Sequence, residues 1–233
     1  MNIFWHFNEL KIRFIYIFVC FFCTFLVSYI NIDIFIFLMI KPLNTNFIFI
    51  NLFEGFYCFF TTSIFLSCFF LFFIVLYSIF DFIKPGLTKN ENKVLVFIIK
   101  VEFCINLLSI FFSYQIFLPH LISFLLSFEQ NKNEHLFNFF FQARLLDYIL
   151  ISLSIFYLIF ILFQFPFFIF LCIQFQIVSF NFFVQFRREF IVLFFLIGCL
   201  LSPPDIYSQI LLAFPCVLLY ELIIFIFIFL ENF

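Results

Sequence analysis

Two acidic residues at the edges of apolar stretches are the best candidates in this sequence for binding a ligand. Glu9 comes shortly before one long apolar stretch, and Glu91 lies in the polar segment before another. A carboxylate at such a boundary can accept charge-assisted and often bidentate hydrogen bonds from a guanidinium group. Each acid could equally neutralise nearby lysine and arginine side chains, so the two residues alone leave both roles open.

Polar side chains inside the apolar stretches are a second group of candidates, because such side chains are costly in lipid. Gln164 lies near the middle of one stretch, and Glu221 lies in the last one. The Gln164 amide needs hydrogen-bond partners, so it should face another helix or a water-filled cavity. Packing between helices and partner binding both explain it. Lys100 and Glu102 flank the start of another stretch, where Lys100 can extend to the interface.

The segment 200–215, LLSPPDIYSQILLAFP, interrupts the apolar sequence with a rigid polar corner. Two prolines end the preceding helix, and an aspartate can cap the first turn of the next. We expect a tight corner between two helices, on the side of the membrane opposite the basic loops. The residues expected to form this corner are Pro203, Pro204, Asp205, Ser208 and Gln209.

No catalytic or metal-binding pattern is evident in the sequence. The three histidines do not cluster with the eight cysteines, and three glycines are too few for a glycine-rich phosphate loop. Cys20 and Cys23 form a C-x-x-C inside an apolar stretch, where cysteine usually acts as a small apolar side chain. The sequence therefore predicts no enzyme activity, no cofactor, no metal site and no nucleic-acid partner.

The elements that carry these residues must lie in lipid. Of the 233 residues, 67% are hydrophobic and 10% are charged, and the mean hydropathy is +1.28. A soluble domain needs more polar surface than this. Apolar stretches of about 20 residues match helices that cross a hydrocarbon core of about 30 Å. Because the two-residue alternation of a membrane barrel is absent, we expect helices.

We expect a single polytopic membrane domain over residues 1–233 with six spanning helices. The apolar segment at 31–44 is too short to cross and should lie at the interface. The fifth span is short for a full crossing, and Pro166 should kink the fourth. The expected spans are 14–32, 55–80, 94–118, 146–172, 190–202 and 206–230.

The basic residues predict the orientation of the chain. The N-terminus, the second loop and the fourth loop together hold 8 of the 11 lysines and arginines. The positive-inside rule places this side, with both termini, in the cytoplasm or its organelle equivalent. Glu9 and Glu91 would then face the same aqueous compartment.

Three motifs, in this order, resemble the TatC family, the polytopic core of the twin-arginine, Sec-independent protein translocase. HFNELKIR (6–13) is similar to H-x-x-E-L-[RK]-x-R, and LYSIFDFIKPGLTKNE (76–91) to L-Y-Q-x-W-x-F-x-x-P-G-L-x-x-x-E. The segment 200–221 resembles L-[LT]-x-P-P-D-x-x-S-Q-x-x-L-A-x-P-x-x-x-L-[YF]-E. Among the departures, Ser78 and Phe80 replace glutamine and tryptophan, and Gln164 stands where many members carry glutamate.

The resemblance implies a cupped, glove-like bundle of six helices and a non-enzymatic translocase subunit. Such a subunit binds signal peptides with paired arginines and, with TatA/TatB-like single-span partners, moves folded proteins using the protonmotive force. Self-association is also expected. The resemblance assigns the arginine pair to Glu9 and Glu91. The expected signal-peptide residues are Glu9, Lys11, Arg13, Phe82, Pro85 and Glu91, and the expected partner and concave face holds Gln164 and Pro166.

Two other functions stay open at this point. A structural membrane subunit of an organelle respiratory complex would also be polytopic and rich in phenylalanine. A small-molecule transporter is disfavoured because no internal repeat is visible. The 53 phenylalanines suggest a thymine-rich organelle gene, so we expect the mitochondrial inner membrane, with a plastid thylakoid or bacterial plasma membrane as alternatives.

Overall fold

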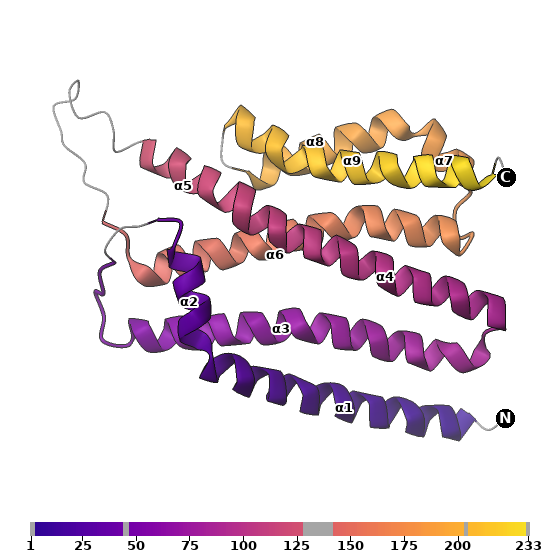
Figure 1. Cartoon of the computed structure of the whole chain (residues 1–233), viewed down its shortest axis with the longest axis horizontal. Coiled ribbons are helices and arrows are strands. Elements are labelled where there is room, and N and C mark those ends of the chain that lie inside the picture. The colour runs from indigo at the N-terminus through magenta and orange to yellow at the C-terminus, as the bar shows by residue number, and fades with distance from the viewer. Residues whose placement is uncertain (1–2, 44–46, 128–141, 203–204, 232–233) are drawn as a thin grey trace. The chain divides into compact units, whose positions relative to one another are not determined.

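The computed structural model describes residues 3–43, 47–127, 142–202 and 205–231, which fold mainly as helices (Figure 1). Helices follow from the apolar composition, because a backbone in lipid must satisfy its hydrogen bonds within the same segment. A 3₁₀ turn, η1, covers Lys84–Gly86 and a π-helical segment, η2, covers Ser113–Phe117. The α-helices are α1 (Ile3–Ile30), α2 (Ile32–Ile40), α3 (Glu54–Ile83), α4 (Lys89–Phe112), α5 (Leu118–Ser127), α6 (Leu145–Gln174), α7 (Phe180–Gln185), α8 (Arg187–Leu201) and α9 (Ile206–Glu231).

Five segments of the described chain are long and apolar enough to cross a membrane, so the protein is a multi-pass membrane protein. They are residues 8–30, 54–86, 91–127, 145–174 and 206–229. At 15 residues, α8 is short for a core of about 30 Å. The apolar segment expected at the interface contains α2, which buries Ile32 and Ile36, one turn apart.

The chain divides into two compact units. Unit 1 comprises Met1–Ile99 and Gln142–Leu153, and unit 2 comprises Lys100–Phe141 and Ser154–Phe233. In unit 1, α1 and α3 lie side by side and run in opposite directions (Figure 1). Hydrogen bonds to α3 carbonyl groups at both ends of α1 hold the pair: Ser28 Oγ donates to Ser63 O at 3.1 Å, and Arg13 Nη1 donates to Ser78 O at 3.0 Å.

In unit 2, α8 packs along α9, and Gly198 lies where the two helices approach closely. A Cβ atom added at Gly198 would lie 3.3 Å from Gln209 O and 3.4 Å from Ala213 Cβ. The Tyr220 hydroxyl, fully buried on α9, donates to Phe183 O of α7 at 2.8 Å. The last three helices are therefore joined by a close backbone contact and a buried hydrogen bond.

Proline residues lie inside three described helices of unit 2: Pro119 in α5, Pro166 in α6 and Pro215 in α9. After α4, the helix changes from α-helical to π-helical geometry at Ser113. It returns to α-helical geometry in α5, which contains Pro119 and continues to Ser127. Proline lacks an N–H donor, and a wider turn is one way to accommodate it. Pro166, expected at a kink, is fully buried inside α6, which is helical on both sides of it.

Candidate functional site

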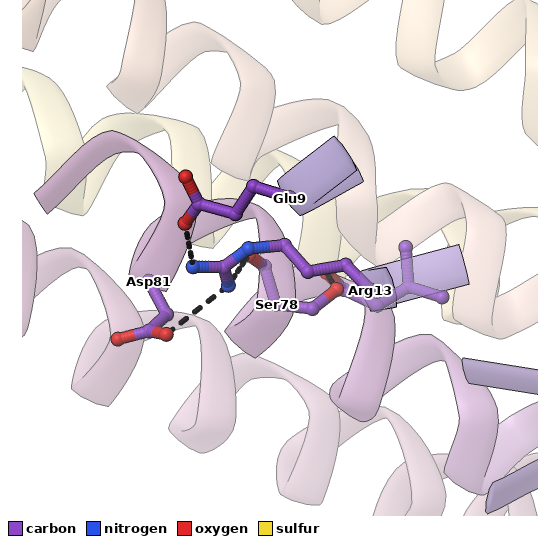
Figure 2. Close-up of polar contacts among 5 residues, drawn as sticks. Glu9, Arg13, Ser78 and Asp81 are labelled. Carbon is purple, nitrogen blue, oxygen red and sulfur yellow. Dashed lines mark hydrogen bonds and ion pairs between the residues drawn. The ribbon is translucent and has the colours of Figure 1, made fainter. Parts of the chain in front are cut away.

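Arg13 of α1 lies between two carboxylate groups in unit 1, as Figure 2 shows. Its Nη2 donates to Glu9 Oε1 at 2.8 Å, and its Nη1 donates to Asp81 Oδ2 at 3.1 Å. The guanidinium carbon lies 5.6 Å from the centre of the Phe82 ring, within the range of a cation–π contact. Because two acids surround one base, this Arg13 cluster (Glu9, Arg13, Asp81 and Phe82) has a net charge of about −1 at neutral pH.

Helical spacing brings the members of the Arg13 cluster together. Glu9 and Arg13 are four residues apart on α1, so their side chains are neighbours on one face. The Arg13 side chain is 21% exposed, whereas those of Glu9 and Asp81 are 43% and 45% exposed. The carboxylates are therefore open to solvent, and the arginine between them is largely covered.

Glu91 forms the start of α4 together with Thr88. Its Oε2 accepts a hydrogen bond from the Thr88 N–H at 2.7 Å, and its own N–H donates to Thr88 Oγ1 at 3.5 Å. This reciprocal pattern is a capping box, which satisfies two N–H groups at a helix start. Glu91 is exposed. The start of α1, the end of α3 and the start of α4 lie at the same end of unit 1 (Figure 1).

Gln164 is buried in unit 2, with a partner inside the same chain. It is 7% exposed, and its Nε2 donates to Asn106 Oδ1 at 2.8 Å. Asn106 in turn donates to Glu102 Oε1 at 2.8 Å. The Gln164 amide therefore links α6 to α4, in agreement with a role in packing between helices.

Asp205 caps the start of α9. Its Oδ1 accepts the Tyr207 N–H at 3.0 Å, and its other oxygen, Oδ2, lies 3.2 Å from His120 Nε2 of α5. These contacts hold the pKa of Asp205 below its ordinary value, with the Tyr207 backbone bond as the largest cause and His120 also contributing. Gln209 Nε2 donates to Phe195 O of α8 at 3.3 Å. The two prolines of the expected corner, Pro203 and Pro204, lie outside the described residues.

Residues 5–215 match the family described as Sec-independent protein translocase protein (TatC). The chain belongs to the TatC family. The match includes the motif of Glu9, the motif of Glu91 and most of the third motif. The family is one of translocase subunits, so the prediction of a translocase subunit without enzyme activity is confirmed.

Relatives along nearly the whole chain agree with this TatC membership. An uncharacterized tatC-like protein, ymf16, of Nephroselmis olivacea is 33% identical, over 94% of this chain and 91% of the relative. The corresponding protein of Reclinomonas americana is 28% identical, over 94% of this chain and 85% of the relative. The Sec-independent protein translocase protein TatC of Rickettsia prowazekii (strain Madrid E) is 30% identical, over 97% of this chain and 92% of the relative.

A solved structure has the same fold. A crystal structure of the twin-arginine translocase receptor TatC in DDM superposes with a TM-score of 0.73 at 24% identity. The superposition covers 95% of this chain and 98% of the other. The prediction of an all-helical membrane fold of the TatC type is therefore confirmed.

The TatC motif residues lie partly together in the structure. Glu9, Arg13 and Phe82 belong to one cluster, and the exposed Lys11 and Pro85 lie on the segments that carry it. Among the described residues, no hydrogen bond or ion pair joins Glu91 to Glu9. Asp81 is not among the predicted site residues, because the second expected span ends at residue 80. Because α3 continues to Ile83, Asp81 lies on a helix, and its position next to the motif residue Phe82 was the available signal.

A second ion pair of this TatC family member, at the opposite end of α3, was also missed. Glu54 is 2% exposed, and its Oε1 accepts hydrogen bonds from Arg144 Nε at 3.0 Å and Nη2 at 2.5 Å. The N–H groups of Ile50 and Asn51 donate to the same carboxylate at 3.0 and 2.9 Å. Glu54 is the main cause that raises the pKa of Arg144 above its ordinary value. The pair ties the loop before α3 to the segment before α6.

Proposed function

We propose that this chain is the receptor subunit of a twin-arginine translocase, which binds signal peptides with paired arginines and supports protonmotive-force-driven transport of folded proteins. The observation that carries the proposal is the family match over residues 5–215, with Glu9 and Glu91 at motif positions, Glu9 partly exposed and Glu91 exposed. An arginine pair on a peptide needs two accessible acceptors, and these acids supply them.

The charge of the site supports binding of a guanidinium group. Arg13 uses Oε1 of Glu9, and the second oxygen of this carboxylate points away from Arg13 (Figure 2). Glu91 is held by a backbone N–H and not by a cation, so its negative charge is not neutralised by an ion pair among the described residues. Lys11, Phe82 and Pro85 then shape the surroundings of the acids, and Arg13 positions Glu9.

The other parts of the proposal rest on the sequence. Single-span proteins of the TatA/TatB type, further copies of this chain and the lipid bilayer are the proposed partners. Gln164 and Pro166, which are buried within the chain, are assigned to the helix of the partner-facing side. Pro203, Pro204, Asp205, Ser208 and Gln209 are assigned to the corner between α8 and α9. We assign both termini to the basic side, and the phenylalanine bias supports the mitochondrial inner membrane.

Peptide binding by the full chain in detergent tests the proposal. We expect a fluorescent peptide with paired arginines to bind more tightly than its paired-lysine counterpart, because guanidinium groups bind carboxylates bidentately. Glu9→Gln and Glu91→Gln together should weaken binding at least tenfold. Gln can replace Glu in a capping box, so Glu91→Gln removes the charge and keeps the start of α4.

Thr88→Ala is the matched control, because it alters the same capping box and leaves the Glu91 charge in place. We expect this variant to lose helix stability and to keep its peptide affinity. Unchanged binding in the Glu9→Gln, Glu91→Gln double variant would overturn the assignment of the two acids. Equal loss of binding in Thr88→Ala would show that α4 folding, and not the charge of Glu91, determines affinity.

A further inference from the structure

Two glutamates of this chain are equally buried and have opposite surroundings. Glu54 and Glu102 are each 2% exposed. Glu54 is paired with the guanidinium group of Arg144 and with two backbone N–H groups. Among the residues that the structure describes, no Lys, Arg or His forms an ion pair with Glu102. One acid thus has a cation as its partner, and the other does not.

The partners of Glu102 are neutral amides. Asn106, with no exposed surface, donates from Nδ2 to Glu102 Oε1 at 2.8 Å and accepts from Gln164 Nε2 at 2.8 Å. We call Glu102, Asn106 and Gln164 the amide–carboxyl cluster. It joins α4 to α6 without a positive charge.

One oxygen of Glu102 is left over. Oε2 is buried and has no hydrogen-bond partner among the described residues. A buried carboxylate oxygen without a donor keeps its full desolvation cost. Among the buried side-chain oxygen and nitrogen atoms of the cluster, Oε2 is the one without a hydrogen-bond partner, so it is the atom at which a proton can bind.

The position of Glu102 along α4 adds to this cost. It follows Glu91, at the start of the helix, by eleven residues, which at 1.5 Å per residue is roughly 16 Å. That distance is about half of a hydrocarbon core of about 30 Å. Ionised side chains at this depth are rare, and they pair with another charge or mark a functional site.

We propose that Glu102 is a proton-binding site inside the membrane. The proton is bound at Oε2, and Oε1 accepts the hydrogen bond of Asn106. A buried O–H group without a partner costs far less than a buried unpaired charge, so the neutral carboxyl group suits this environment. The Asn106 amide binds it without a counterion. Gln164 then belongs to the same site, as the residue that fixes the Asn106 amide from α6.

This site gives the chain a titratable group inside the membrane. Among the described residues, this group takes part in no ion pair. The inference does not depend on the proposed function, because proton binding by Glu102 is measured without a peptide, a partner or transport. If the chain proved not to bind twin-arginine peptides, the inference about Glu102 would still stand.

Infrared difference spectroscopy of the full chain in lipid vesicles near neutral pH tests the proposal. The C=O stretching band of a neutral carboxyl group should be present in the unmodified protein and absent from Glu102→Gln. Glu54→Gln is the matched control, because Glu54 has the same exposure and a cation beside it. We expect Glu54→Gln to remove only carboxylate signal and to leave the neutral carboxyl band.

Asn106→Leu provides a second readout that does not require Glu102 to be replaced. It removes the donor to Oε1, so the neutral carboxyl band should remain and move to higher frequency. Identical spectra of the unmodified protein and Glu102→Gln in the neutral carboxyl region would overturn the proposal. If Glu102→Gln does not fold, an unmoved band in Asn106→Leu would overturn it equally.

Discussion

Asp81 of α3 accepts a hydrogen bond from Arg13 of α1, with 3.1 Å between Oδ2 and Nη1, although 68 residues separate the two in sequence. This contact fixes the start of α1 against the end of α3 by charge, in addition to the apolar contacts along the two helices. It also places a second acidic group beside the motif acid Glu9, and this acid is not itself a motif residue.

The Arg13 cluster predicts a specific pattern of non-additive effects. Arg13→Gln should lower the melting temperature because it leaves Glu9 and Asp81 as two unneutralised charges close together. Adding Asp81→Asn should recover part of the loss, since the repulsion is removed. Exposed pairs contribute ~0.2–1 kcal/mol each, so the total effect should be about 1 kcal/mol. Thermal unfolding of the four variants of this cycle in detergent measures it.

Lys11→Gln is the control for the Arg13 cycle, because it removes an exposed charge from the same turn of α1. We expect no change in its melting temperature. Additive losses in Arg13→Gln, Asp81→Asn and their combination would contradict the cluster.

Breaking the Glu54–Arg144 pair should cost more than breaking the Arg13 cluster. Arg144→Gln leaves a carboxylate that is 2% exposed without its cation, whereas the acids of the Arg13 cluster remain in contact with water. The double variant Glu54→Gln, Arg144→Gln should be more stable than Arg144→Gln alone. Melting temperatures decide the order, with Arg188→Gln, an exposed arginine, as the control. A smaller loss in Arg144→Gln than in Arg13→Gln would refute this ranking.

Asp205 predicts a loss of stability in acid. The Tyr207 N–H, and after it His120, hold the pKa of Asp205 below its ordinary value of 3.8. A lowered folded-state pKa stabilises the fold above the unfolded-state pKa, and this contribution disappears as the pH falls through the folded-state value. Between about pH 5 and pH 2, the melting temperature should therefore fall more steeply in the unmodified chain than in Asp205→Asn. Ser208→Ala, which keeps the carboxyl group, should follow the unmodified chain, and parallel curves for all three would disprove the role of Asp205.

Gly198 should tolerate no large side chain. A Cβ atom there meets the Gln209 carbonyl oxygen at 3.3 Å, so Gly198→Ala should be mildly destabilising and Gly198→Leu should separate α8 from α9. Gly86→Ala is the matched control, because nothing lies within 4 Å of its added Cβ atom. Cysteine crosslinking between α8 and α9 in detergent reports the separation. Equal crosslinking in the Leu variant and the control would count against the close contact.

Contacts between residues close together in the sequence could be predicted, whereas contacts between residues far apart in the sequence could not. The long apolar stretches indicate the helices, and the three motifs indicate the family, because both are local patterns. The ion pair of Glu9 with Arg13 at four residues and the T-x-x-E capping box at Glu91 are likewise visible as spacings.

The partners of the buried polar residues depend on how the helices pack. Arg144 is 90 residues from Glu54, and Asn106 is 58 residues from Gln164, so no spacing rule connects them. The sequence placed Glu102 at the edge of a span, next to Lys100, and assigned it no role. Only the hydrogen bonds from Gln164 to Asn106 and from Asn106 to Glu102 show that Glu102 is buried beside amide groups.

The capping box at Glu91 has a consequence for any cationic ligand. Oε2 of Glu91 accepts the Thr88 N–H at 2.7 Å, so a bidentate peptide arginine, which uses both carboxylate oxygens, would share Oε2 with the start of α4. A carboxylate oxygen can accept two hydrogen bonds, so the arginine and the Thr88 N–H can bind Oε2 together without competing. The bound arginine then holds the capping carboxylate in place, and amide exchange at the start of α4 should not rise as the site fills.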